Sequence, residues 1–352
     1  MKGPTMRQPA RRQSGFTLAE LMVSVALGLM IIAGMTTLFV NNNNAQAALE
    51  TASRQVENGR YAMQLMGTDL RNAGFYAEFD PTVLPAPATV PDACSVDMDE
   101  VKASLKLHVQ GVDNASATAL ACLDDIAAGT DILVVRHANT CIAGAEDCEA
   151  VADGGPFLQA SLCDNVSELN SGNPDTFFAV GTDAAALPLT RRDCETAAAL
   201  RRLQVHIYYI AANNEEGDGI PTLKRAELRS DGEAAFRIVP LVEGIQNMQL
   251  EYGMDTDADG AADSYATDPA TFNGCALAAC AITNWSNVLA TRVSLLARNT
   301  VPTAGHTDTK TYQLGYLSDG TANTVAAAND GFKRHVFQSL VNLPNPTGRK
   351  AP

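Results

Sequence analysis

An apolar run near the start of this 352-residue chain constrains its fold more than any other feature. The run extends over 25 residues, from Phe16 to Val40, and contains one charged side chain, Glu20. As a helix it would be about 37 Å long, which is enough to cross a bilayer. A secretory signal peptide is the ordinary alternative, but the run is long for that class. It is followed by Asn41–Asn44 and not by a small-residue cleavage site. We therefore expect a membrane-spanning helix.

Charge is distributed unevenly along the chain. Residues 1–15 carry four basic side chains and no acid, whereas the whole chain has a formal net charge of −15. A basic head before an apolar helix indicates a cytoplasmic N-terminus and an exported acidic domain. The acidic balance argues against a nucleic-acid-binding surface, which would need a basic patch. We expect no nucleic-acid partner.

The residues in front of Glu20 indicate what its carboxylate is for. A carboxylate inside an apolar segment is costly and usually has a partner, unless it lies near the headgroups and reaches water. Residues 11–20 read RRQSGFTLAE, so that a basic leader ends in Gly15 and Glu20 follows four residues after Phe16. This segment resembles the type IV prepilin signature, in which the leader is followed by Phe-Thr-Leu-x-Glu and an apolar helix.

The resemblance implies how the N-terminus is processed. A prepilin peptidase would cleave between Gly15 and Phe16, and the new terminus at Phe16 would be N-methylated. Residues 1–15 would be the leader, and residues 16–40 the transmembrane and pilus-core helix. Glu20 would pair with the terminal amine of a neighbouring subunit during assembly, since a charge pair in an apolar bundle offsets the desolvation of both groups. The protein would be a single-pass inner-membrane protein with a periplasmic C-terminal domain, and would then join a pilus at the cell surface.

Residues 41–74 are expected to continue the helix as an amphipathic stalk. No proline lies between residues 9 and 81. Small and apolar side chains recur at alternating spacings of four and three, as on one face of a helix; they are Ala45, Leu49, Ala52, Val56, Gly59, Met63, Met66, Leu70 and Ala73. Gly28, Gly34 and Gly59 weaken such a helix. They indicate either close packing or local melting, or are simply tolerated.

Further segments narrow the resemblance from type IV pilins in general to one kind of minor pilin. Residues 57–63 (ENGRYAM) and 69–75 (DLRNAGF) look like the stalk signature of PilW-type minor pilins. Residues 242–252, 291–296 and 335–337 are similar to blocks found in PilW-type pilins and in J-type pseudopilins. The resemblance implies an α+β, type IV pilin-like fold. In it the long N-terminal helix packs on a β-rich, loop-rich domain, here residues 75–352.

The residue pattern of the expected exported domain is typical of β-structure. Alternating and β-branched runs predict strands at Ser104–Val109, Asp131–His137, Leu203–Ala211, Leu223–Leu228, Met248–Tyr252, Val288–Arg298, Thr311–Leu314 and His335–Leu343. Asn213–Gly219 reads as a hairpin loop. Residues 77–130 and 140–199 carry little of the resemblance and read as loop-rich insertions.

Eight cysteines follow the apolar run and none precedes it. An even number on the exported side indicates disulfides in an oxidising compartment. The close pairs Cys141/Cys148 and Cys275/Cys280 are our first expectation, and Cys94/Cys122 and Cys163/Cys194 are then the simplest pairing of the rest. Zinc is the alternative, but no C-x-x-C motif or His/Cys cluster occurs.

Residues 255–263 read DTDADGAAD and begin like a calcium loop. Oxygens at alternate positions can converge on one cation, and a glycine permits the sharp turn. The expected ligands are the carboxylates of Asp255, Asp257, Asp259 and Asp263 and the carbonyl of Ala261. The twelfth position is Ala266 and not a bidentate Glu, so the loop is not a full EF-hand. Calcium is one interpretation and a solvated acidic turn is the other.

The sequence proposes no active site. Hydrolase, nucleotide-binding and metalloprotease motifs are missing. The five histidines, His108, His137, His206, His306 and His335, are scattered. We interpret His137 and His206, which fall in expected strands, as structural. We expect no enzyme activity and no required cofactor, with calcium as the candidate ion.

The function that these features indicate is structural. We expect a minor pilin that assembles with other minor pilins and the major pilin into the initiating or tip complex of a type IV pilus, for motility or adhesion. Alternatives are a J-type minor pseudopilin of type II secretion, a membrane-anchored periplasmic enzyme, and a calcium-dependent adhesin at the pilus tip.

Overall fold

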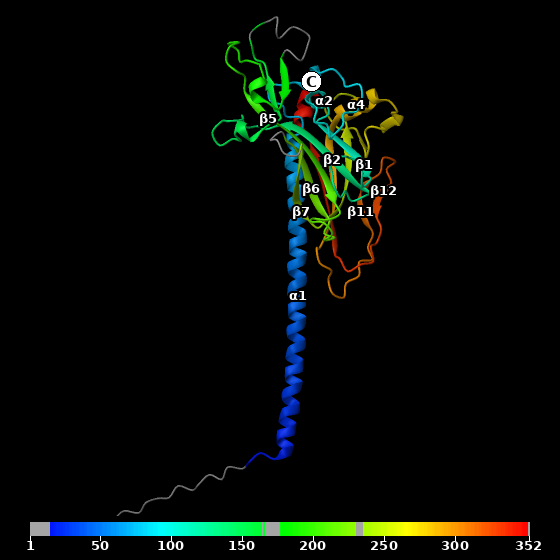
Figure 1. The fold of residues 1–352 in the computed structure, drawn as a ribbon. Coiled ribbons are helices and arrows are strands. Elements are labelled where there is room, and N and C mark those ends of the chain that lie inside the picture. The colour runs from blue at the N-terminus through cyan, green and yellow to red at the C-terminus, as the bar shows by residue number, and fades with distance from the viewer. Residues whose placement is uncertain (1–14, 164, 166–176, 230–234, 351–352) are drawn as a thin grey trace, which may run out of the picture. The chain divides into compact units, whose positions relative to one another are not determined.

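The computed structural model describes residues 15–163, 165, 177–229 and 235–350, and the chain divides into two compact units, Met1–Glu50 and Thr51–Pro352. The helix α1 (Leu18–Asn72) belongs to both, and a β-rich domain follows it (Figure 1). Gly74 lies just after the end of the helix, and its positive φ of 73° is the left-handed conformation that follows the last turn of many helices. The continuous helix expected from the sequence agrees with these bounds.

The first unit consists of the N-terminal part of α1. Its apolar side chains are exposed, from Phe16 at 89% and Leu18 at 79% to Val40 at 48%. By length and composition α1 is able to cross a membrane. A β-carbon added at Gly28 or Gly34 would meet no atom within 4 Å.

The second unit contains a seven-stranded antiparallel sheet in which β5 forms a fork. β5 pairs with β2 along one edge and with both β3 and β6 along the other, and β1, β4 and β7 are outer strands. The strands are β1 (Val109–Ala115), β2 (Thr130–Ala138), β3 (Phe157–Ala160), β4 (Phe178–Gly181), β5 (Leu200–Ala211), β6 (Thr222–Leu228) and β7 (Phe236–Glu243).

The strands after β7 form a four-stranded antiparallel sheet in the order β13-β10-β8-β9. They also form a separate two-stranded ribbon of β11 and β12. Its strands are β8 (Ile245–Met254), β9 (Ser264–Ala266), β10 (Val288–Arg298) and β13 (Arg334–Asn342), and the ribbon is β11 (Tyr312–Tyr316) and β12 (Ala322–Val325). The short helices are α2 (Met98–Ser104), α4 (Ala278–Ser286) and α5 (Pro344–Lys350).

Two hydrophobic clusters cover the two faces of the seven-stranded sheet. In the first, Leu133 and Tyr208 pack with Met66 and Leu70 of α1 and with the four-stranded sheet. In the second, the alternate residues of the same strands, such as Ile132, pack against side chains from residues 75–126. Every residue of β2 is buried because both of its faces are covered.

Residues 77–130 were expected to be a loop-rich insertion, but they supply eight of the 21 buried residues of the second hydrophobic cluster. Phe79, Leu84, Val101 and Leu105 from this segment are all at most 4% exposed. The expected strand Ser104–Val109 was wrong. Asp97 caps a helix there, accepting hydrogen bonds from the backbone N–H groups of Asp99 and Glu100, and the strand begins only at Val109.

The buried face of α1 differs in part from the apolar stripe that the sequence predicts. Gly59, Met66, Leu70 and Ala73 are buried as expected, whereas Leu49 is 73% exposed. Two polar side chains, Gln55 and Asp69, lie on the buried face instead. The Gln55 amide donates to the carbonyls of Ala297 (2.8 Å) and Lys333 (2.9 Å), which joins the helix to β10 and to the segment before β13.

Candidate functional site

The N-terminal end of α1 carries the residues expected for processing and assembly. Gly15 and Phe16 are exposed, and the rest of the expected leader, residues 1–14, lies outside the described residues. Glu20 Oε2 accepts hydrogen bonds from Thr17 N and Thr17 Oγ1, both at 2.9 Å, and Thr17 Oγ1 accepts from Glu20 N at 3.3 Å. These reciprocal bonds are a capping box, which the spacing Thr17-x-x-Glu20 could have indicated.

The capping box decides where the Glu20 carboxylate lies. It is held over the first turn of its own helix, beside the residue that would become the new N-terminus after cleavage at Gly15–Phe16. A neighbouring amine would have to share or displace the Thr17 donors to reach it. Glu20 therefore lies at the start of α1, with its carboxylate hydrogen-bonded within the first turn.

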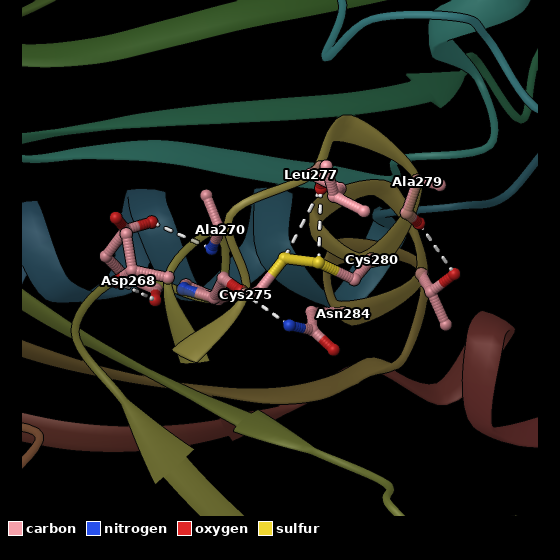
Figure 2. The surroundings of a disulfide bond; sticks show 10 residues. Asp268, Ala270, Cys275, Leu277, Ala279, Cys280 and Asn284 are labelled. Atoms are coloured by element: carbon pink, nitrogen blue, oxygen red, sulfur yellow. Dashed lines mark hydrogen bonds between the residues drawn. A yellow bond between two sulfur atoms is a disulfide. The ribbon is translucent and has the colours of Figure 1, made fainter. Parts of the chain in front are cut away.

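The eight cysteines form four disulfides: Cys94–Cys122, Cys141–Cys148, Cys163–Cys194 and Cys275–Cys280. These are the pairs expected from their order along the chain. Figure 2 shows Cys275–Cys280, which closes the turn leading into α4; on that helix the Asn284 side chain donates to the Pro269 carbonyl at 2.9 Å. Each bridge therefore fixes a local loop.

The expected calcium loop brings three of its four carboxylates together. Asp255, Asp257 and Asp263 each place an oxygen within 4.8 Å of the other two, and Asp255 is buried. Asp259 is outside this group and accepts a hydrogen bond from Ala261 N at 2.8 Å. Lys350 Nζ lies 3.5 Å from Asp255 Oδ2 and competes with any cation there. Burial would raise the pKa of Asp255, but backbone hydrogen bonds and Lys350 lower it.

A buried polar cluster beside α1 was not predicted from the sequence. We call Asp69, His137 and His206 the Asp–His–His cluster; they come from α1, β2 and β5 and are 7–8% exposed. Asp69 Oδ1 lies 2.8 Å from His137 Nε2, and Asp69 Oδ2 lies 2.9 Å from His206 Nδ1. Tyr208 also donates to Asp69 Oδ2 at 2.9 Å. His137 and His206 were interpreted separately as structural, and no spacing rule joins them to a helix residue that lies 68 positions before the one and 137 before the other.

The surroundings of Asp69 and His137 favour the charged forms of these two side chains. Burial alone would raise the pKa of Asp69, but the charge of His206 and hydrogen bonds from both histidines hold it well below its usual range. Burial would lower the pKa of His137, but the hydrogen bond and charge of Asp69 raise it. Asp69 is therefore an anion, and its carboxylate stabilises positive charge between α1 and the sheet.

Two segments of the chain match known family models. Residues 207–345 match the type IV pilus-assembly protein W (PilW) family, and residues 10–36 match the prokaryotic N-terminal methylation motif. A solved structure, a type IV-like pilin from Thermus thermophilus, aligns with 83% of this chain and 97% of its own, at 13% identity and a TM-score of 0.36. No curated protein matches the chain. The matched segments are the start of the chain's apolar helix and the region from within β5 to the start of α5, and in both the chain is similar to PilW-type pilins.

Proposed function

We propose that this PilW-like pilin is a minor pilin that joins other minor pilins in the complex that initiates polymerisation of the major pilin and remains at the pilus tip. The observation that carries the proposal is the position of Glu20. It lies one turn from Phe16 on a helix whose apolar side chains are exposed in the single chain. Such a helix needs lipid before assembly and neighbouring helices afterwards.

The assembly step follows from the geometry at the helix start. Removal of the leader after Gly15 creates an amine on Phe16, next to Thr17. The Glu20 carboxylate, satisfied by Thr17 N and Oγ1 within the single chain, then accepts the amine of a neighbouring subunit as a further donor. A carboxylate can accept several hydrogen bonds at once, so this exchange leaves no charge unpaired in an apolar environment.

The proposed topology places the N-terminus in the cytoplasm and residues 75–352 in the periplasm, with prepilin peptidase as the processing partner. Four basic side chains in residues 1–15 support this orientation. The four disulfides support an oxidising compartment for the domain. Motility or adhesion by the assembled pilus would be the cellular outcome.

The test compares a deletion strain complemented with wild type, Glu20→Ala, Glu20→Gln or Thr17→Ala. Sheared surface pili are quantified against the total major pilin, and membrane levels of each variant are measured by immunoblot. The deletion should lose most surface pili and retraction-dependent movement, and both Glu20 variants should be impaired at normal protein level. Thr17→Ala is the matched control, because it removes one partner of Glu20 but leaves the carboxylate.

Secretion of type II substrates is measured in the same strains. Normal pili with blocked secretion in the deletion strain would show a pseudopilin and overturn the minor-pilin proposal. Normal pili and normal secretion would overturn the assembly role. Loss of pili in the deletion strain but not in either Glu20 variant would overturn the charge-pair step while leaving the priming role.

A further inference from the structure

The Asp–His–His cluster is unusual because the outer nitrogen of each ring already has an acceptor. His137 Nδ1 lies 3.0 Å from the carbonyl oxygen of Ala138, which can only accept, so Nδ1 carries a hydrogen. His206 Nε2 lies 3.2 Å from Gln204 Oε1, also an acceptor. In the neutral rings, the lone pairs are therefore on His137 Nε2 and His206 Nδ1. These are the two nitrogens that face Asp69.

Two nitrogen lone pairs and two carboxylate oxygens that face one another need positive charge between them. Either two protons or one divalent cation supplies it. The charge added is the same in both cases, so the charges of Arg225, Glu227 and Arg229, which pair with one another beside Tyr208, do not discriminate between them. Coordination chemistry decides between the two.

The arrangement has the features of a metal site. Two imidazole nitrogens and a carboxylate from three different elements each place one atom within 4.8 Å of the others. Zinc prefers this N/O donor set. Metal-binding histidines almost always donate the other ring N–H to a carboxylate, a backbone carbonyl or water, as His137 does to the Ala138 carbonyl. The other ring nitrogen of His206 has the side-chain amide oxygen of Gln204 as its acceptor. The Tyr208 hydroxyl orients the Asp69 carboxylate in the same way.

We propose that Asp69, His137 and His206 bind a zinc ion that ties α1 to β2 and β5. The three ligands are at most 8% exposed, and the helix and both strands contribute to the core, so the ion would be structural. The zinc site would lie where α1 enters the domain. Its role is separate from the Glu20 charge pair and from the acidic loop at residues 255–263.

The experiment uses the full chain in detergent, stripped with a chelator and then dialysed against Zn²⁺ or Co²⁺. Metal content and the thermal midpoint are measured for the wild type, His137→Gln, His206→Gln and Asp69→Asn. The wild type should retain one Zn²⁺ per chain, unfold at a higher temperature than the stripped protein, and give visible Co²⁺ absorption bands typical of low coordination number. The three variants should lose the ion and these bands.

Two controls keep the test specific. His335→Gln removes an exposed histidine from β13, and Asp257→Asn alters the other carboxylate group; both should retain the ion. Wild type that keeps no more zinc than His137→Gln, or whose thermal midpoint is unchanged by the chelator, would overturn the proposal and leave two protonated histidines. The Co²⁺ bands and the chelator effect are read on the wild type, so they hold even if a variant fails to fold.

Discussion

The ring of Phe337 on β13 lies against the α-carbon of Gly59 on α1, so closely that a β-carbon at residue 59 would be 2.1 Å from Phe337 Cε2. A glycine inside a helix costs about 1 kcal/mol relative to alanine. At this position the missing side chain makes room for an aromatic ring from the C-terminal strand. The close-packing interpretation of Gly59 therefore explains the residue, and no local melting is needed.

Gly59→Ala should destabilise the domain, because the ring of Phe337 must move out of its packed position. Overpacking costs about 1–3 kcal/mol, which the better helix propensity of alanine offsets only in part. The measurement is the denaturant midpoint of the purified chain. Pairing Gly59→Ala with Phe337→Leu should recover part of the loss.

Gly67→Ala is the matched control. Gly67 is also buried on α1, but the nearest atoms to an added β-carbon, from Arg71 and Val341, are at 3.7–3.8 Å, which is ordinary contact. This substitution should be neutral or stabilising. Equal losses at both positions would show that the Phe337 contact is not what requires glycine at residue 59.

Acid should destabilise the domain through His108. This ring is 4% exposed and its Nε2 donates to the Val288 carbonyl at 2.6 Å. Burial above all, and then the charges of Arg349, Lys350 and Arg136, lower the pKa of His108 to about 4, although the bond to Val288 raises it. The unfolded chain, with a pKa near 6.5, binds a proton between these values that the folded chain does not. The free energy of unfolding should therefore fall as the pH drops from about 6.5 to about 4.

His108→Gln keeps a donor for Val288 and removes the titration. Urea unfolding between about pH 7.5 and pH 4.5 should show a pH-dependent loss in wild type that exceeds that of the variant, by an amount on the order of 3 kcal/mol at most. His335→Gln, at an exposed position, should follow the wild type. A variant that loses as much as the wild type over this range would rule out His108 as the source.

Calcium should raise the thermal midpoint of the wild type if the loop at residues 255–263 binds it. Asp257→Asn with Asp263→Asn should abolish the rise, because each removes a charged oxygen from the group of three. Asp319→Asn, in another exposed turn, should leave it intact. Lys350→Gln should strengthen calcium binding, because it removes the ammonium 3.5 Å from Asp255. Calcium that fails to shift any of these midpoints would favour the solvated acidic turn.

Removal of Cys94–Cys122 should cost more stability than removal of Cys275–Cys280. The bridges close loops of sequence separation 28 and 5, and the chain-entropy model gives about 3.5 and about 2 kcal/mol for loops of these sizes. Double Cys→Ser variants of each pair are compared by denaturant unfolding. The reverse order would mean that native contacts, and not loop closure, dominate the effect.

Patterns of apolar residues along the chain predicted the long helix and the longer strands. The apolar run, the missing prolines and the alternation of residues 203–211 correspond to α1 and β5 as the structure has them. The short strands β3 and β4 were missed because four residues carry too little periodicity to stand out. The pairing of Asp69 with His137 and His206 was missed because it depends on which face of α1 meets the sheet, and two polar residues lie on that face.

The four disulfides all lie between Cys94 and Cys280, and none spans more than 31 residues. None of them joins α1 to a strand, since α1 contains no cysteine. The packing of α1 on the domain therefore depends on non-covalent contacts, among them Phe337 on Gly59, the amide of Gln55, and the cluster at Asp69. Under tension the helix would detach before any covalent bridge breaks, and the loops would stay closed for it to dock again.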